Sequence, residues 1–279
     1  MAEIEARRVM SALAGPVRGI RNLGDQLSFH AYAYSHIPKA IKDYRREVIR
    51  LLAEVSLGTG ALALIGGTVV VVGFLCAAAG IEVGLEAYTS FDNIGVGVLS
   101  GFFSAYFNTR EVAPIIAGVA LTATVGAGFT AQIGAMRVSE EIDALEVMAV
   151  PPVAYLVTTR ILAGLIAIVP LFAVAVMMTW LATKLVVTVG YDQAVGDYQH
   201  YFSTFLVPSD LFLAIAKVLL MGLVIVSICC YHGFRASGGP AGVGRAVGAA
   251  VRSALICTMF VDLVFGIAIW GGPSVHISG

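Results

Sequence analysis

Charged residues are scarce in this sequence. Of its 279 residues, 17 are Lys or Arg and 18 are Asp or Glu, together 13%, whereas a soluble domain carries about 25%. Apolar residues make up 58% of the chain, and a net charge of −1 leaves no basic surplus for binding nucleic acid. The composition excludes an ordinary soluble domain and indicates a membrane protein.

Recognisable catalytic motifs are also missing. The sequence has no G-x-x-x-x-G-K-[ST] phosphate loop, no G-x-S-x-G nucleophile elbow and no H-E-x-x-H zinc helix. Its four cysteines lie within or at the end of apolar runs and never at C-x-x-C spacing, and its five histidines are scattered. We therefore expect no catalytic residue, no metal site and no cofactor bound by this chain.

Long apolar runs are present and define the expected membrane spans. About 20 apolar residues suffice to cross the hydrocarbon. Five runs are long enough: 57–79, 112–136, 161–183, 211–231 and 253–272. The last two contain one charge each, Lys217 and Asp262. A sixth run, residues 94–107, has only 14 residues, so we expect a short re-entrant or interfacial segment there.

The distribution of Lys and Arg predicts the orientation. Five crossings with a cytoplasmic N-terminus place 14 of them inside and two outside. If residues 94–107 also crossed, the counts would be 11 and five. Because positive residues favour the cytoplasmic side, five crossings are preferred. The C-terminus is then extracytoplasmic, and the chain is expected in the plasma (inner) membrane.

The predicted fold is an all-α polytopic membrane protein with one domain over residues 1–279. Residues 1–56 are cytoplasmic or interfacial, 57–272 form the transmembrane core, and 273–279 are an extracytoplasmic tail. Residues 40–56 alternate basic and apolar positions at helical spacing, which predicts an amphipathic helix in the membrane interface. That helix is either a topology anchor or a docking element for a partner.

Small residues recur every four positions in the run 112–136. They are Gly118, Thr122, Gly126, Thr130 and Gly134. Such ladders let helix backbones approach closely in a membrane. Two interpretations remain open, ordinary packing within the chain and a specialised dimer or sliding interface.

A polar segment, residues 136–152, separates two spans on the predicted cytoplasmic side. Ser139 can cap a helix start, acidic residues favour its first turn, and Pro151 with Pro152 ends it. We expect a short helix over 139–148. Its apolar stripe comprises Val138, Ile142, Leu145 and Ala149. An isolated helix this short is marginal in water, so either a partner protein or the membrane surface must hold it.

Ionisable residues at membrane depth are functional candidates, because a charge at the bilayer centre costs about 2.5–3.5 kcal/mol on the insertion scale. Lys217 and Asp262 differ in depth by roughly one helical turn, which a Lys side chain can reach, so we expect an ion pair. The alternative is a snorkelling Lys and a separately solvated Asp. Arg110 and Glu111 could meet a lipid head group, or they could be each other's counter-ions.

Residues 108–163 strongly resemble the MlaE/YrbE permeases, the membrane subunits of ABC-type lipid transporters that work with MCE proteins. Three motifs carry the resemblance: R-E-x-x-P at Arg110, Glu111 and Pro114, G-x-M-R-x-[ST]-E-x-[IL] over 134–142, and L-E-V-M-x-V-x-P over 145–152. Weaker similarity extends over about 40–272. LLAEVSLGTGALALIGGT and SAYFNTREVAP look like the B-type YrbE chain of an actinobacterial mce operon. One departure is ATVGAG after Thr122, where many relatives have a basic residue before the second Gly.

The resemblance implies a transporter subunit and no enzyme. A second permease chain, of A type, would complete the membrane core, and a separate cytoplasmic ATPase dimer would bind ATP and Mg. The ATPase would dock on the segment that includes Arg137, Ser139, Glu140, Glu141, Asp143, Leu145 and Glu146. A lipid, such as a fatty or mycolic acid, would occupy a cavity open toward MCE proteins outside.

Under this hypothesis Arg110, Glu111, Lys217 and Asp262 line or gate the lipid cavity. A second hypothesis is an ion-coupled secondary carrier with Asp262 as its proton site. It predicts inverted repeats and helices broken at the midplane, which the sequence does not show. A third, a non-transporting membrane scaffold, leaves the intramembrane charges without a purpose.

Overall fold

The computed structural model describes residues 24–57 and 67–271, which are almost entirely helical and contain no strand. Five helices are long and apolar enough to cross a membrane, so the predicted all-α polytopic fold with five spans is confirmed. They are Gly67–Asp92 (α5), Gly97–Val138, Val153–Gly190, Pro208–Phe234 (α12) and Gly239–Trp270 (α13). The first predicted span, 57–79, includes residues 58–66, which lie outside the described residues.

Two of the spans are composite helices in which α-helical pieces alternate with wider π-helical segments. The pieces of the second span are η1 (Gly97–Leu99), α6 (Ser100–Phe103), η2 (Ser104–Val112), α7 (Ala113–Leu121), η3 (Thr122–Gly126) and α8 (Ala127–Val138). The third consists of η4 (Val153–Thr158), α10 (Thr159–Leu185) and η5 (Val186–Gly190). Within them η2, η3, η4 and η5 are π-helical. Segments of this kind are frequent at functional sites.

Residues 94–107 differ from the expected separate segment. The chain turns at Gly95, whose φ is +75°, and from Gly97 it continues without a break into the helix that contains 112–136. At 1.5 Å per residue this helix is about 63 Å long, roughly twice the hydrocarbon thickness of about 30 Å. The sequence criterion separates the two runs because Arg110 and Glu111 interrupt the apolar pattern, yet both are neutralised by charges from other helices.

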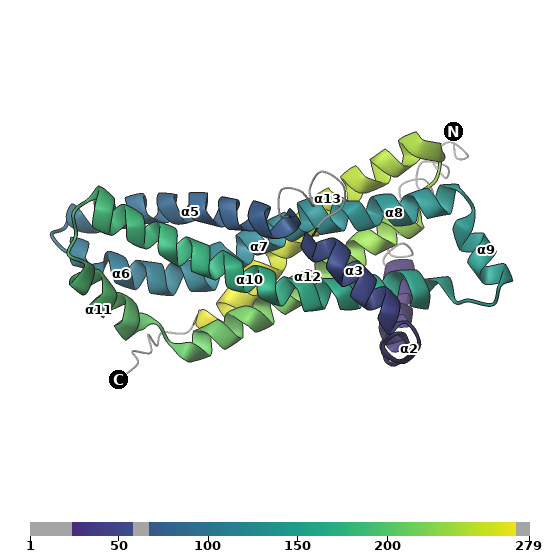
Figure 1. Ribbon diagram of the computed structural model, residues 1–279, viewed down its shortest axis with the longest axis horizontal. Coiled ribbons are helices and arrows are strands. Elements are labelled where there is room, and N and C mark those ends of the chain that lie inside the picture. Colours follow the sequence, from purple (N-terminus) through teal and green to yellow (C-terminus); the bar gives the residue numbers. More distant parts are fainter. Residues whose placement is uncertain (1–23, 58–66, 272–279) are drawn as a thin grey trace, which may run out of the picture.

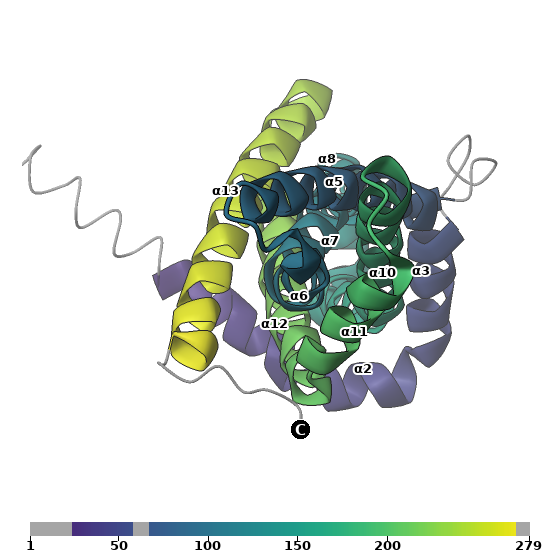
Figure 2. The ribbon, with the colours of Figure 1, turned by 90° about the vertical axis from the view of Figure 1, so that its left-hand side faces the viewer.

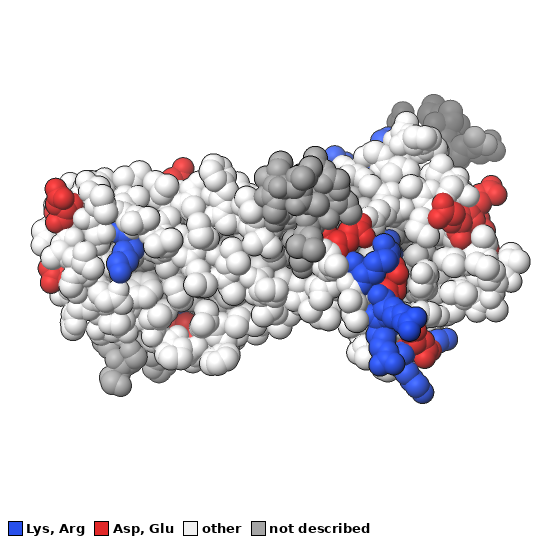
Figure 3. Space-filling view, in the orientation of Figure 1, with Lys and Arg blue, Asp and Glu red and all other residues white. Residues whose placement is uncertain are grey.

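The spans run roughly along the long axis of the molecule (Figure 1). One end carries α6, α11 (Val195–Phe205) and the last turns of α5, and the other carries α9 (Glu141–Val147). On the face shown in Figure 3, most Lys and Arg lie over α2 and α3, with acidic residues beside them and toward α9, and a largely uncharged surface separates them from the charged residues at the α11 end. The uncharged surface is where lipid would contact the bundle.

The N-terminal region is helical over 24–35, in α2 (Ile37–Asp43) and in α3 (Arg45–Leu57). The single helix expected over 40–56 is interrupted at Tyr44, whose φ is −117°. In α3 the predicted apolar stripe is buried against the bundle through Val48, Leu51 and Val55. These helices run around the outside of the bundle (Figure 2). Part of their apolar surface packs on protein, while Leu27, Ile41 and Ile49 are exposed.

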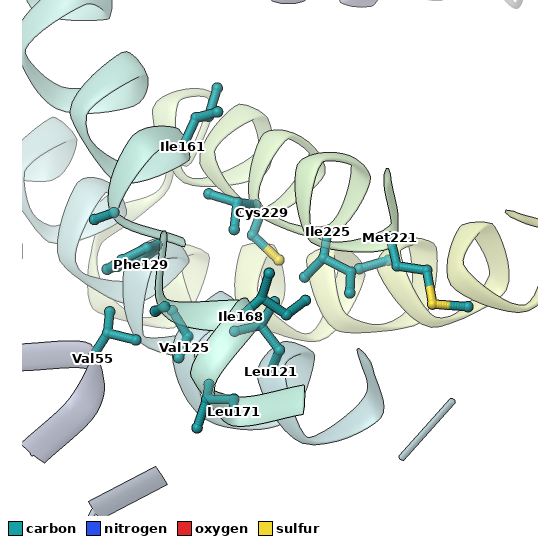
Figure 4. Packing of buried hydrophobic residues seen from close by; sticks show 14 of the residues in the cluster. Val55, Leu121, Val125, Phe129, Ile161, Ile168, Leu171, Met221, Ile225 and Cys229 are labelled. Atoms are coloured by element: carbon teal, nitrogen blue, oxygen red, sulfur yellow. The ribbon is translucent and has the colours of Figure 1, made fainter. Parts of the chain in front are cut away.

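The hydrophobic core lies where α10 contacts α5, α7, α12 and α3. Figure 4 shows Leu121, Ile168 and Ile225 from three different spans side by side in this core. Helix α13 is peripheral and packs mainly on α12 and α8. Only 11% of the residues in its most apolar 18-residue stretch are buried, against 33–56% in the corresponding stretches of the other four spans. Most of the apolar surface of α13 is therefore open to lipid or to another subunit.

Candidate functional site

A buried lysine lies at the centre of a charge cluster between three spans. Lys217 of α12 has no exposed side-chain surface, and its Nζ lies 2.5 Å from Asp262 Oδ1 of α13. The same Nζ donates hydrogen bonds to Glu111 Oε2 at 3.0 Å and to the main-chain carbonyl of Arg110 at 2.9 Å, both in η2. The expected Lys217–Asp262 pair is present, and Glu111 is a second carboxylate partner that the sequence did not reveal.

Arg110 pairs with Asp210 and not with Glu111, its neighbour in the sequence. Its guanidinium donates two hydrogen bonds to Asp210 Oδ2 at the start of α12, of which the one from Nε is 3.0 Å long. Its Cζ also lies 3.7 Å from the centroid of the Tyr106 ring. Trp270 Nε1 donates to Asp210 Oδ1 at 3.2 Å. Of the two alternatives for Arg110 and Glu111, that of mutual counter-ions is wrong, because each has a partner on another helix.

Sequence reasoning misses Asp210, Tyr106 and Trp270. Asp210 precedes the run 211–231 by one residue and so reads as a loop residue, although its position next to a span was an available signal. The two aromatic residues carry no charge and give no signal of their own. Their contribution is to shield the Arg110–Asp210 pair, which is nine-tenths buried, from solvent.

The cluster as a whole joins the second span, α12 and α13 through ion pairs that lie largely out of water. Its members differ in access: the side chain of Glu111 is 30% exposed, that of Asp262 12%, and that of Lys217 not at all. A ligand arriving from outside the chain therefore meets Glu111 first. Buried ion pairs give little net stability but fix how helices are matched, so the cluster can set the register of three helices.

The small-residue face of the second span packs within the chain. A Cβ added at Gly126 would lie 2.7 Å from Cys229 Sγ of α12, and one at Gly118 would lie 3.1 Å from Thr258 of α13. Thr130 Oγ1 donates a hydrogen bond across this contact to the Cys229 carbonyl at 3.0 Å. Between the two interpretations of the ladder, these contacts favour ordinary close packing of α12 and α13 against it.

The polar segment between the second and third spans contains the expected short helix, α9. It begins after Glu140, which has a left-handed φ of +61°, and the chain leaves it before Ala149, at φ +59°. Ser139 does not cap this helix as expected. It is the C-cap residue that follows the preceding helix α8, and its hydroxyl lies 2.9 Å from Glu141 Oε1. The ends of α9 are therefore set by the left-handed backbone at Glu140 and Ala149, and not by Pro151 and Pro152.

Helix α9 shows one face to the bundle and another to solvent. Ile142 is fully buried and Leu145 partly buried, so the middle of the predicted stripe faces the protein, whereas Ala149 at its end is exposed. Val147 and Met148 at its end are 88% and 63% exposed. Arg137 pairs with Asp143 at 2.6 Å, while the remaining carboxylates, those of Glu140, Glu141 and Glu146, are exposed. The exposed side combines negative charge with two apolar side chains.

A second buried polar contact ties the N-terminal helices to the bundle. Arg160, which is 3% exposed, donates from Nη2 to Gln132 Oε1 at 3.1 Å, and the amide of Gln132 donates to Glu54 of α3. Glu54 also contacts Arg50, which pairs with Glu47 at 2.5 Å. Glu47 lies outside the spans, and its hydrogen bond with Arg50 lowers the pKa of its carboxyl. This chain of contacts fixes α3 against the second and third spans.

Comparison with known proteins adds an independent observation. The profile of the family "Permease MlaE" matches residues 58–268, which is most of the chain and includes the charge cluster and α9. The chain belongs to the MlaE permease family. The match begins after α3, so the N-terminal helices lie outside it.

Relatives of this MlaE-family chain include two that are named as probable ABC transporter permeases. A probable ABC transporter permease of Rickettsia prowazekii is 30% identical over 177 residues, 63% of this chain and 68% of the relative. A probable ABC transporter permease of Synechocystis is 33% identical over 159 residues, 56% and 59% of the two chains. The chloroplast protein TRIGALACTOSYLDIACYLGLYCEROL 1 of Arabidopsis thaliana is 27% identical over 180 residues, 64% and 51%. The chain is thus an integral, multi-pass membrane permease.

Proposed function

We propose that this permease is the membrane subunit of an ATP-driven lipid transporter and passes lipid between an MCE-protein tunnel outside and the plasma membrane. The substrate class is a fatty-acid-like, mycolic-acid-like or other hydrophobic lipid. Family membership supports a permease, and the names of two relatives point to ABC transport. The name of the Arabidopsis relative includes that of a lipid, trigalactosyldiacylglycerol, which agrees with a lipid substrate.

The observation that carries the proposal is the surface of α9. A helix of seven residues is too short to be stable alone in water, yet it presents exposed carboxylates beside exposed Val147 and Met148. Exposed apolar side chains surrounded by polar ones are typical of protein contacts. We assign this surface to a cytoplasmic ATPase dimer that binds ATP and Mg, since this chain has no phosphate-binding loop of its own.

The orientation follows from the same assignment. If α9 faces the ATPase, the N-terminal helices are cytoplasmic, α11 lies outside, and the C-terminus is extracytoplasmic. The exposed apolar residues in the second half of α13, such as Leu263 and Ile267, leave room for a second YrbE-type permease, of A type if this chain is of B type. MCE proteins would then meet the end of the bundle that carries α6 and α11.

The charge cluster would serve the lipid path in two ways. Glu111, its most exposed member, would face the cavity. Lys217 and Asp262 would hold α12 and α13 against the second span, and Arg110 with Asp210 would do the same at the end of α13. In this role the cluster gates the path by fixing helix positions, with Glu111 as the residue nearest to lipid.

The coupling assignment can be tested by neutralising α9. The Glu141→Gln/Glu146→Gln variant should lower permease-stimulated ATPase activity of the purified complex, while the variant chain keeps its thermal stability because both side chains are exposed. Glu82→Gln/Glu86→Gln, which changes two exposed carboxylates of α5 away from α9, is the matched control. Unchanged permease-stimulated ATPase activity in the α9 variant would contradict the assignment of α9 as the ATPase-docking surface.

A further inference from the structure

A polar cavity of about 590 Å³ lies where α12 ends and α13 begins, away from the charge cluster. Its volume is within the range of about 300–1,000 Å³ that small-ligand sites occupy. Arg235, the residue that follows α12, and Arg245, in the first turns of α13, both line it. The other polar side chains of the lining belong to Gln26, Tyr231, His232, Ser237 and Ser253.

Within the part of the chain that the structure describes, the cavity carries more positive charge than nearby carboxylates neutralise. Arg235 has one carboxylate partner, Asp25, at 3.5 Å, and both side chains are about half exposed. Arg245 forms no ion pair within residues 24–57 and 67–271, and its guanidinium lies beside Gly238, in the turn between the two helices. Two guanidinium groups facing one cavity are suited to an anion with several oxygens, such as a phosphate, because each can donate two parallel hydrogen bonds.

The surroundings of the cavity favour a lipid over a soluble anion. Ser253 lines the cavity and is the first residue of the apolar run 253–272. Ile256 and Phe260, three and seven residues further along α13, lie on the same face of the helix and are 71% and 65% exposed. An exposed apolar strip therefore continues along α13 from Ser253, which lines the cavity.

We propose that this cavity binds the headgroup of an anionic glycerophospholipid in the cytoplasmic leaflet. The phosphate contacts Arg235 and Arg245, and the acyl chains lie along Ile256 and Phe260. The site is separate from the charge cluster and from α9, so it does not depend on what the permease transports. Its occupant would neutralise the arginines and hold the turn between α12 and α13 against the membrane surface.

The test measures lipid binding to the purified full-length chain by native mass spectrometry. Phosphatidylglycerol and phosphatidylcholine of equal chain length are compared on the wild type and on Arg235→Gln/Arg245→Gln. Each arginine near an anionic surface contributes about a factor of five, so the variant should bind phosphatidylglycerol about 25-fold more weakly. Lys42→Gln/Arg46→Gln is the matched control, because it removes two exposed positive charges from the N-terminal helices, away from the cavity.

Three outcomes decide the matter. Selective retention of phosphatidylglycerol that is lost in the cavity variant and kept in the control supports the site. Equal loss in both variants means non-specific attraction by net charge and overturns it. Displacement of phosphatidylglycerol by millimolar inorganic phosphate or glycerol phosphate would assign the cavity to a soluble anion and overturn the lipid proposal. Melting temperature and size-exclusion profile of each variant verify that it is folded.

Discussion

Replacing Lys217 tests the charge cluster most sharply. Lys217→Met keeps the length of the side chain but leaves Glu111 and Asp262 facing each other without the cation between them. Removing one partner of a buried ion pair costs about 3–5 kcal/mol. Because the side chain of Glu111 is 30% exposed and can be hydrated, we expect the lower end, about 3 kcal/mol. For a chain of this size that corresponds to a fall in melting temperature of roughly 6–12 °C.

The assay is thermal unfolding of the purified chain in detergent, followed by intrinsic fluorescence. Lys184→Met, at a partly exposed lysine whose Nζ donates a hydrogen bond to Gln199 at 3.4 Å and forms no ion pair within the described residues, is the matched control and should change the melting temperature little. The decisive variant is Lys217→Met/Glu111→Gln/Asp262→Asn. It removes the uncompensated carboxylates as well and should recover most of the lost stability.

Two results would refute this reasoning. A Lys217→Met chain as stable as the wild type would mean that the carboxylates are already protonated or hydrated and do not need the lysine. A triple variant no more stable than the single one would mean that the loss comes from packing of the lysine stem instead of from unpaired charge.

Two further predictions concern packing. Gly126→Ala should destabilise the chain by about 1–2 kcal/mol, because the new Cβ would lie 2.7 Å from Cys229 Sγ, whereas Gly128→Ala, with no atom within 4 Å of the added Cβ, should not. Combining Gly126→Ala with Cys229→Ala should recover part of the lost melting temperature. Equal melting temperatures for the two glycine variants would contradict the close contact. Gln132→Leu removes the amide between Arg160 and α3 and should cost about 1–3 kcal/mol while hydrogen exchange in α3 accelerates; unchanged exchange there would show that apolar packing alone holds the helix.

The five spans, the short helix after the second span and the Lys217–Asp262 pair could be predicted from the sequence. Length without charge is enough to identify a span, and two opposite charges at similar depth on neighbouring helices have few other partners. The continuity of 97–138 could not be predicted, because Arg110 and Glu111 read as the end of an apolar run. Only their partners on α12 and α13 make those charges compatible with a continuous helix.

The position of apolar stripes was harder to infer than their existence. Val48, Leu51 and Val55 do form a stripe, but the bundle buries it where the sequence suggested a membrane surface. Periodicity shows that one face of a helix avoids water and does not show what covers it. Asp210 illustrates a related limit, since a residue one position outside a run looks like part of a loop until the facing helix is known.

The central claim, that the chain is the membrane subunit of an ATP-driven lipid transporter, is tested most directly by reconstitution. The chain would be placed in liposomes with its co-purified permease, ATPase and MCE partners, and transfer of a fluorescent lipid would be followed with ATP, with a non-hydrolysable ATP analogue and with an imposed proton gradient. The account predicts transfer that requires ATP hydrolysis and falls in the Glu141→Gln/Glu146→Gln variant. Transfer by the chain alone along a proton gradient, independent of ATP, would contradict it.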